Sequence, residues 1–345
     1  MRSLWRILCL LCAVMLASAT AAPLAPPEHR RGLEQTWLSV PEWYLVHSPT
    51  EFATYLAQDG KPSAFPWIGH IGQLWGSYAA ATQAQVGDSR SAPNPGYHVM
   101  DLVTAGSTSV EYSVRAGYEL TAGRLAELTR GAAPTAEEKL AAKVAQDYVD
   151  FIRARPWYEF DFFTQLAAVW RDTGAWGPDL LRKWERKYAL TTEYLAKGLC
   201  AQIVRLVTPA SRAASKPTTA IVVDRWLDRI DGAWPEMQRL RSYQTGGQLL
   251  LVPRHAAFSA VSLAIARSGA NFVEVAGNGQ DAPILLSALA PEDWRPASAG
   301  EWLRQPVITR PGSVRVLMAV PITRLAQTLR DLDASGVRLE HIHDY

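Results

Sequence analysis

The spacing of apolar residues divides the chain into a helical first part and a mixed second part. Over residues 34–207 the apolar positions recur every three or four residues, which is the period of an amphipathic helix. Three capping signatures, each a Ser or Thr followed three residues later by Glu, predict helix starts at Ser39, Ser48 and Thr135. The pattern therefore predicts a helical domain over residues 34–207.

The longest helical pattern follows Gly177-Pro178. Its apolar positions run from Leu181 to Leu206 in steps of three and four that repeat every 11 residues, which predicts a straight helix. At about 1.5 Å per residue it would be roughly 45 Å long. We expect its apolar stripe to face the core, as the spine of the domain. Shorter patterns predict helices over residues 108–130 and 136–153.

Residues 221–345 follow a different pattern, in which short β-like runs alternate with helical stretches. The runs at 248–254 and 315–323 each end in Val-Pro, and each is followed by a helical stretch, a glycine and a second β-like run, at 271–275 or 337–342. Two such βαβ units of nearly equal length indicate a duplicated motif.

This arrangement resembles the ferredoxin-like superfold over about 100 residues, and because that superfold hosts many unrelated functions, the resemblance implies an architecture and no activity. The predicted fold class is α+β: a Trp-rich helical N-terminal domain followed by a ferredoxin-like, βαβ-duplicated α/β sandwich over residues 221–345.

Two Pro-rich or polar stretches border the predicted domains. Residues 22–33 are predicted to be a flexible leader, and residues 208–220 a linker between the two domains.

The N-terminus has the features of an export signal. Arg2 and Arg6 precede a short apolar run, and small residues follow, with an A-x-A cleavage pattern at Ala19-Thr20-Ala21. We therefore expect residues 1–21 to be a signal peptide and the protein to be exported, to the periplasm or the cell envelope. The alternative is that the segment stays uncleaved and anchors the chain as an N-terminal helix.

The charged residues and the cysteines limit which partners and which covalent links are expected. Removal of Arg2 and Arg6 with the signal leaves 33 of the 35 basic residues, which balances the 33 acidic residues. A chain without net positive charge does not favour nucleic-acid binding. Cys200 would be the last remaining cysteine, so no internal disulfide is expected, and its place in a helical pattern predicts a buried, inert thiol.

The segment "RARPWYEFDFF" (153–163) contains the candidate catalytic residues. In an extended chain Glu159 and Asp161 would share one face as an acid/base pair, and Trp157 could stack on a sugar ring, which would make the protein a cell-envelope glycan hydrolase. The simpler interpretation is that Asp161 caps the next helix and that Glu159 pairs with a nearby arginine. No known nucleotide-binding, hydrolase or metalloprotease motif accompanies them, and no cofactor is expected.

The C-terminal sequence "VRLEHIHDY" contains the candidate metal ligands. Strict strand alternation would place His341 and His343 on the face of Val337 and Leu339, where that face leaves the core toward solvent. Two histidines need at least one more ligand, and His255 is the other candidate. A strand end with partly buried imidazoles is the favoured interpretation.

The aromatic residues give the broadest functional indication. Eight of the 13 Trp lie in residues 34–207, where they would fill a core, lie in a membrane interface or bind a glycan. The sequence favours an exported, non-enzymatic binding or interaction protein, with a peripheral membrane or envelope protein as partner. It leaves the oligomeric state open.

Overall fold

The computed structural model describes residues 22–33, 36–207, 217–227, 234, 236–244, 246–297 and 300–345. The predicted signal peptide over residues 1–21 lies outside the described residues, as do residues 208–216 of the predicted linker. The rest of that linker is partly strand, because β1 begins at Thr218.

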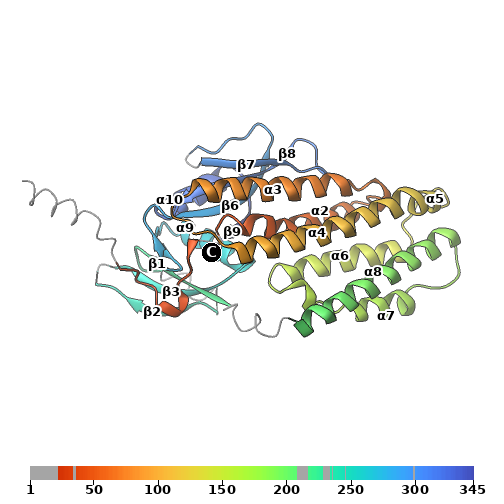
Figure 1. Ribbon diagram of the computed structural model, residues 1–345, viewed down its shortest axis with the longest axis horizontal. Coiled ribbons are helices and arrows are strands. Elements are labelled where there is room, and N and C mark those ends of the chain that lie inside the picture. The colour runs from red at the N-terminus through yellow and green to blue at the C-terminus, as the bar shows by residue number, and fades with distance from the viewer. Residues whose placement is uncertain are drawn as a thin grey trace, which may run out of the picture.

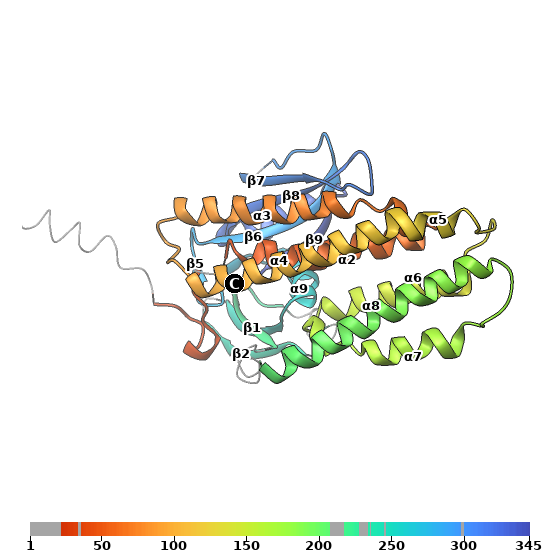
Figure 2. The same ribbon diagram turned by 45° about the vertical axis from the view of Figure 1, so that its right-hand side comes forward.

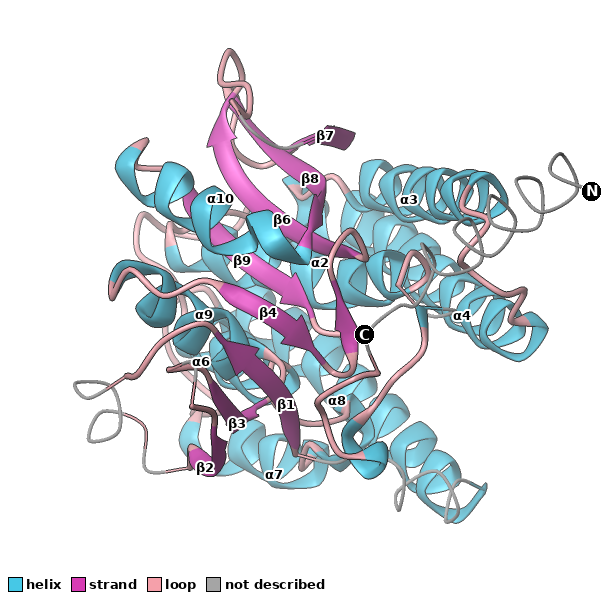
Figure 3. Cartoon of the chain, turned by 90° about the vertical axis from the view of Figure 1, so that its left-hand side faces the viewer, coloured by secondary structure: helices cyan, strands magenta, loops and turns pink. Residues whose placement is uncertain are grey.

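The α-helices that precede the first strand fill one end of the molecule and also run along the sheets (Figure 1). They are α2 (Ser39–Ala57), α3 (Trp67–Gly87), α4 (Pro95–Tyr118), α5 (Arg124–Glu127), α6 (Ala136–Ile152), α7 (Phe162–Asp172) and α8 (Leu180–Val207). A π-helical turn over Glu119–Gly123 joins α4 to α5. Figures 1 and 3 show α3, α4 and α8 along one side of the molecule, toward the viewer in Figure 1 and to the right in Figure 3.

The other end contains two antiparallel sheets and two helices. The first sheet has the order β2-β3-β1-β4-β5, and the second has the order β7-β8-β6-β9. The strands are β1 (Thr218–Val223), β2 (Gln238–Ser242), β3 (Gln248–Pro253), β4 (Phe272–Val275), β5 (Asn278–Gly279), β6 (Pro283–Pro291), β7 (Gly300–Pro306), β8 (Ser313–Pro321) and β9 (Arg338–His343). Helix α9 (Ala256–Arg267) connects β3 to β4, and α10 (Ile322–Ala334) connects β8 to β9.

The predicted α+β class is confirmed, whereas the specific ferredoxin-like duplication is not. Both predicted strand–helix–strand units are present, as β3-α9-β4 and β8-α10-β9. In each unit a third strand, β1 or β6, lies between the two connected strands and runs antiparallel to both. The strands belong to two sheets and not to the single sheet of one sandwich.

The second sheet is covered on both faces. On one face Ile284, Leu286 and Met318 join a core that α9, α10 and the first sheet share. On the other face Leu285 and Leu317 pack against apolar side chains at the start of α2 and on α3. Figure 2 shows α2 and α3 beside β6, β8 and β9. Because successive strand residues point to opposite faces, β6 contributes to both cores.

Helix α2 is one continuous helix where two were predicted. Neither Ser39 nor Ser48 caps a helix start, and Pro49 lies inside α2. Pro49 cannot donate a backbone hydrogen bond, but tertiary contacts on either side hold the helix together, including a hydrogen bond of 2.8 Å between Ser48 Oγ and Tyr112 Oη. The third predicted start is confirmed, because Thr135 forms a complete capping box with Glu138.

The leader, predicted to be flexible, packs on the first sheet over residues 22–33. The backbone N–H groups of Leu24 and Ala25 each donate to the Glu274 carboxylate at 2.7 Å. Arg31 donates to the Thr219 hydroxyl at 2.9 Å and lies 3.4 Å from a carboxylate oxygen of Asp344. Polar and charged partners that are distant in the chain therefore hold a segment whose composition alone indicates a loop.

Candidate functional site

A stripe of polar and aromatic side chains along α2 faces the end of the second sheet. Ser39, Trp43, His47 and Glu51 follow one another at intervals of four residues, so they share one side of the helix. They meet Arg315 on β8 and Glu340, His341 and His343 at the end of β9. We call this set of eight residues the α2–β9 junction.

The stripe on α2 pairs with β9 step by step. Ser39 Oγ lies 2.9 Å from His343 Nδ1. One turn on, the Trp43 ring stacks on the His341 ring with a centroid separation of 3.4 Å. One further turn along α2, the Nδ1 atom of His47 lies 3.9 Å from Glu340 Oε1.

Arg315 is the charged centre of the junction. Its Nε donates to Glu340 Oε2 at 2.6 Å, and its Nη1 donates to Glu51 Oε1 at 3.1 Å. Burial by itself would raise the pKa of Glu340, but the charge of Arg315 lowers it to about 2. Burial raises the pKa of Glu51, which Arg315 opposes. The junction therefore contains a buried ion pair between Arg315 and Glu340, with Glu51 as a second acceptor.

The histidines around this ion pair are neutral. Burial lowers the pKa of His343 to about 3, and burial together with the charge of Arg315 lowers the pKa of His47 to about 3. The same two causes lower the pKa of His70 on α3 to about 4. His70 Nδ1 lies 2.9 Å from Tyr44 Oη, and His70 Nε2 lies 3.7 Å from a carboxylate oxygen of Glu51.

A bulge in β9 places both candidate histidines in the junction. His341 pairs with Ser287 and Leu339 pairs with Ala288, so the register passes over Glu340. The extra residue reverses the alternation, and His341 and His343 face α2 while Ile342 faces the α9–α10 core. The prediction of partly buried imidazoles near solvent is therefore wrong: both residues are only 2% exposed.

The three candidate metal ligands do not form a metal site in the described part of the chain, where no group of three His, Cys, Asp or Glu residues is arranged to hold a metal. His255 does come within electrostatic reach of His341 and contributes to lowering its pKa, after burial, His343 and His47. Its own position is at the start of α9, with a positive φ of 60°.

The candidate catalytic carboxylates do not lie on an extended segment. Residues Trp157–Glu159 form a 3₁₀ turn, and Asp161 is the N-cap of α7. The Asp161 carboxylate accepts from the backbone N–H of Thr164 at 3.0 Å and from its hydroxyl at 2.7 Å. This is the capping role that the simpler interpretation predicted, and the catalytic role of Glu159 and Asp161 stays a prediction.

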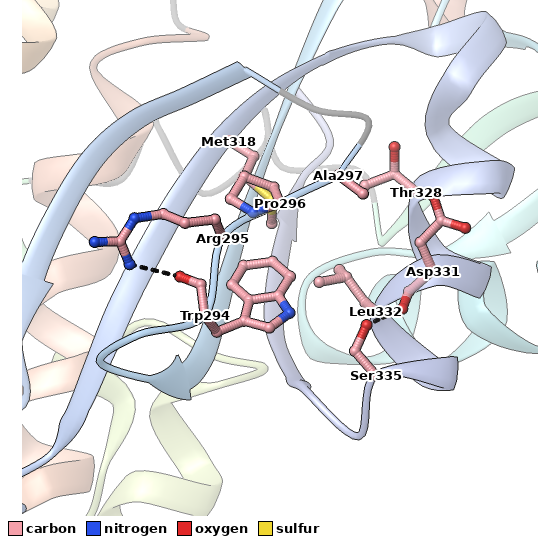
Figure 4. A pocket seen from close by; sticks show the side chains of 9 residues that line it. All are labelled: Trp294, Arg295, Pro296, Ala297, Met318, Thr328, Asp331, Leu332 and Ser335. Carbon is pink, nitrogen blue, oxygen red and sulfur yellow. Dashed lines mark hydrogen bonds between the residues drawn. The ribbon is translucent and has the colours of Figure 1, made fainter.

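Two pockets on the described surface lie away from these residues. Figure 4 shows one of about 50 Å³, between the loop carrying Trp294 and the C-terminal turn of α10 around Ser335. That volume holds a few water molecules at most, well below the roughly 300 Å³ of a small-ligand site. A second, wider one of about 280 Å³ is lined by Arg310 and Arg338 among others. Neither is lined by a residue of the α2–β9 junction.

The second unusual feature is the outward side of α4 and α8. Large apolar side chains on these helices are between 43% and 78% exposed. We call this set the outer helical face: Val99, Val103, Val110 and Val114 on α4, and Leu181, Tyr188, Leu195, Leu199, Ile203 and Leu206 on α8. The apolar stripe of α8, predicted to face the core, is thus on the outside, and Cys200, predicted to be buried, is exposed.

The charged residues of α8 occupy the inside instead. Lys183 Nζ donates to Glu137 Oε1 at 2.9 Å, and all of Lys183 except a small fraction is buried. Arg186 donates to both oxygens of Glu119, at 2.9 and 3.0 Å, and Arg182 Nε donates to Glu138 at 2.9 Å. These ion pairs, with α6 and with the π-helical turn, hold the charged side of α8 inward. The apolar side of α8 therefore faces outward.

Helix α6 has the opposite and usual orientation. Its exposed positions include Lys143, Gln146, Asp147 and Asp150. The exposed apolar side of α4 and α8 continues into the π-helical turn and α5, where Leu120 and Leu125 are also exposed, but it does not extend to α6. None of the helices in the described part of the chain combines the length and the hydropathy that crossing a membrane requires.

Sequence patterns contained part of this information. The four-residue interval from Ser39 to Glu51 is visible in the sequence, but the capping signature at Ser48 divides it between two predicted helices. The partners Arg315 and Glu340 could not be inferred, because only the tertiary structure brings β8 and β9 to α2.

Comparisons with protein families, with curated proteins and with solved structures find no match. The function must therefore be argued from the junction and the outer helical face.

Proposed function

We propose that this chain is an exported, non-enzymatic binding protein of the cell envelope, and that it binds through the outer helical face. The observation that carries the proposal is the orientation of α8, which buries Arg182, Lys183, Arg186 and Lys187 and exposes Leu195, Leu199 and their neighbours. A surface helix of a globular protein usually has the reverse arrangement, with its apolar side toward the core and its charged side toward water.

The size of the face supports the proposal. Ten large side chains, each roughly half or more exposed, present on the order of 1,000 Å² of apolar surface. The largest apolar patch on a typical monomer is about 300–600 Å² and is often functional. We infer that a partner covers this face in the cell.

The α2–β9 junction indicates a structural role for the part of the molecule outside the outer helical face. Its imidazoles are held neutral in a packed interface, where no substrate could reach them without separating α2 from β9. We propose that the junction fixes the helices on the second sheet and so presents the outer helical face as a rigid surface.

We also propose that the two-sheet end is a duplicated unit related to the ferredoxin-like arrangement. The orders β2-β3-β1-β4 and β7-β8-β6-β9 correspond strand for strand, and α9 and α10 occupy equivalent places. This end would have no activity of its own.

Cell fractionation tests the proposed function. The full chain is produced in a Gram-negative host, and the mass of the exported product shows whether it begins at Ala22, as signal cleavage requires. We expect the wild type in the envelope fraction and the double variant Val114→Glu/Leu195→Glu in the soluble fraction. The control is Leu240→Glu on β2, because Leu240 is 44% exposed and Leu195 is 43% exposed. If the double variant fractionates like the wild type, as the control should, the outer helical face does not carry the binding and the proposal fails.

A further inference from the structure

The wider of the two pockets lies over the end of β6, where segments that are distant in the chain meet. On one side Leu289 pairs with Arg338, the first residue of β9. On the other side Pro291 pairs with Ser313, the first residue of β8. The turn between β7 and β8 contributes Arg310. The volume of about 280 Å³ is close to the roughly 300 Å³ at which small-ligand sites begin. The pocket therefore has room for a small ligand.

The charged groups that line this pocket are two arginines, Arg310 and Arg338. Within the described residues, neither guanidinium lies within ion-pair distance of a carboxylate. The nearby carboxylates of Asp333 and Glu340 each form an ion pair with another arginine, at 2.6 Å in both cases. The side chain of Glu292, close to the end of β6, does not line the pocket. The pocket therefore carries two positive charges that these neighbouring acids do not neutralise.

The corresponding place in the first sheet is closed by a carboxylate. Strand register makes Asp224, at the end of β1, the counterpart of Leu289, and it makes Asn271 the counterpart of Arg338. Asp224 accepts from the backbone N–H of Asn271 at 2.9 Å and from its side-chain amide at 2.8 Å. In the second sheet a leucine replaces the acceptor and an arginine replaces the amide donor. The second sheet therefore keeps a donor at this place without the internal anion.

Backbone hydrogen bonds order the turns that carry the pocket. The Arg310 N–H donates to the Val307 carbonyl at 2.8 Å, and the Ser313 N–H donates to the Arg310 carbonyl at 3.1 Å. Gly312 and Gly336 have φ values of 78° and 67°, which glycine adopts at little cost, and a side chain at either would face open space. Because the backbone is already ordered, a ligand would not have to order it on binding.

We infer that this pocket binds a phosphate group, either free or as a phosphomonoester. A carboxylate has two oxygens, which one guanidinium fork can occupy, whereas a phosphate has oxygens for Arg310, for Arg338 and for the Ser313 hydroxyl. The inference goes beyond the proposed function, because it concerns a different surface from the outer helical face. Binding here involves no chemical step.

Isothermal titration calorimetry on the full chain tests the site. Sodium phosphate and sodium acetate are titrated at the same ionic strength, so that screening of the two arginines is equal in both experiments. We expect saturable binding of phosphate, and binding of acetate that is weaker by about tenfold or more, since acetate cannot accept from both guanidinium groups at once.

Three arginine variants show whether phosphate binds in this pocket. Arg310→Gln and Arg338→Gln should each weaken phosphate binding about tenfold or more, because each removes a charge and its hydrogen bonds to the anion. The matched control is Arg324→Gln, an exposed arginine near the other end of α10, which should bind like the wild type. Thermal unfolding without phosphate should be the same for all three variants, which shows that weaker binding does not come from a loss of folded protein.

Vesicles distinguish a free phosphate from one on a lipid headgroup. Phosphatidylcholine vesicles with and without phosphatidic acid, whose headgroup is a phosphomonoester, are added to the wild type and to the variants. Binding of phosphatidic acid that both Arg310→Gln and Arg338→Gln weaken would support a lipid source. Binding of inorganic phosphate alone, with the same dependence on the two arginines, would support a soluble source.

The inference fails if neither inorganic phosphate up to about 10 mM nor phosphatidic acid binds in a way that depends on Arg310 and Arg338. It also fails if acetate binds as tightly as phosphate, or if Arg324→Gln weakens binding as much as the other two variants. None of these outcomes affects the proposed function, because its fractionation test changes residues of the outer helical face.

Discussion

Single residues in the α2–β9 junction depend on partners that are distant in the chain. Arg315 is almost fully buried and is neutralised by Glu340 and Glu51. A buried ion pair of this kind adds little to stability compared with well-packed apolar residues, but removal of one member leaves a buried charge without its partner. The junction therefore makes stability sensitive to each of its charged members.

Arg315→Met should lower the free energy of unfolding by about 3–5 kcal/mol, because Glu340 would remain buried without a cation. Urea unfolding measures the change. Arg304→Met is the control: Arg304 pairs with Glu301 in a more exposed setting, where loss of the pair should cost about 1 kcal/mol or less. Equal effects of the two variants would contradict a buried ion pair.

Asp161→Ala should lower the free energy of unfolding by about 1 kcal/mol, because α7 loses the acceptor for the Thr164 N–H. Asp161→Ser should retain most of the stability, and Glu159→Ala should change it by about 0.5 kcal/mol or less. Thermal unfolding of the three variants checks this. If Asp161→Ser retains its stability but abolishes cleavage of an envelope glycan, the hydrolase hypothesis is supported.

At the scale of elements, α8 shows that an apolar stripe does not decide which side of a helix is buried. Its inward side carries Lys183, Arg186 and Leu190, and ion pairs with Glu137 and Glu119 fix that orientation. The predicted length of the helix is confirmed, while the predicted direction of its stripe is wrong. The periodicity of a helix fixes which residues share a side, and the partners decide which side is inside.

Two leucines on α8 test this orientation. Leu190→Ala, at a buried position, should lower the free energy of unfolding by about 2–5 kcal/mol, whereas Leu195→Ala should change it by about 0.5 kcal/mol or less in the isolated protein. Chemical denaturation gives both values. A larger loss for Leu195→Ala would mean that the stripe is buried and that α8 is turned the other way.

On the scale of the whole molecule, the junction joins the helices to the second sheet, and its histidines make that union dependent on pH. Burial lowers the pKa of His343 and of His47 to about 3 and that of His70 to about 4. The unfolded chain binds protons on these groups near pH 6.5, and the folded chain does not until much lower pH. Stability from these groups is therefore complete above pH 6.5 and is lost as the pH falls.

Between pH 6.5 and 4, each of these histidines should lower the free energy of unfolding by up to about 1.4 kcal/mol per pH unit. Denaturant titrations at several pH values measure the slope. His47→Gln should make the slope shallower by about that amount, since Gln cannot take up a proton. An unchanged slope in His47→Gln would contradict a neutral, buried His47.

The sequence by itself determined the elements whose signals are local. The helices from Ala136 and from Leu180, the capping box at Thr135 and the two strand–helix–strand units follow from periodicity and capping chemistry, which act within a few residues. The cap at Asp161 was predictable for the same reason.

The tertiary structure alone decided how these elements face one another. It made α2 continuous through Pro49, reversed the face of His341 and His343 by a bulge at Glu340, and turned the charged side of α8 inward. Each outcome depends on a partner more than 20 residues away, such as Arg315 for Glu51, and a local pattern carries no information about such a partner. Contacts between distant segments therefore decided both the α2–β9 junction and the outer helical face.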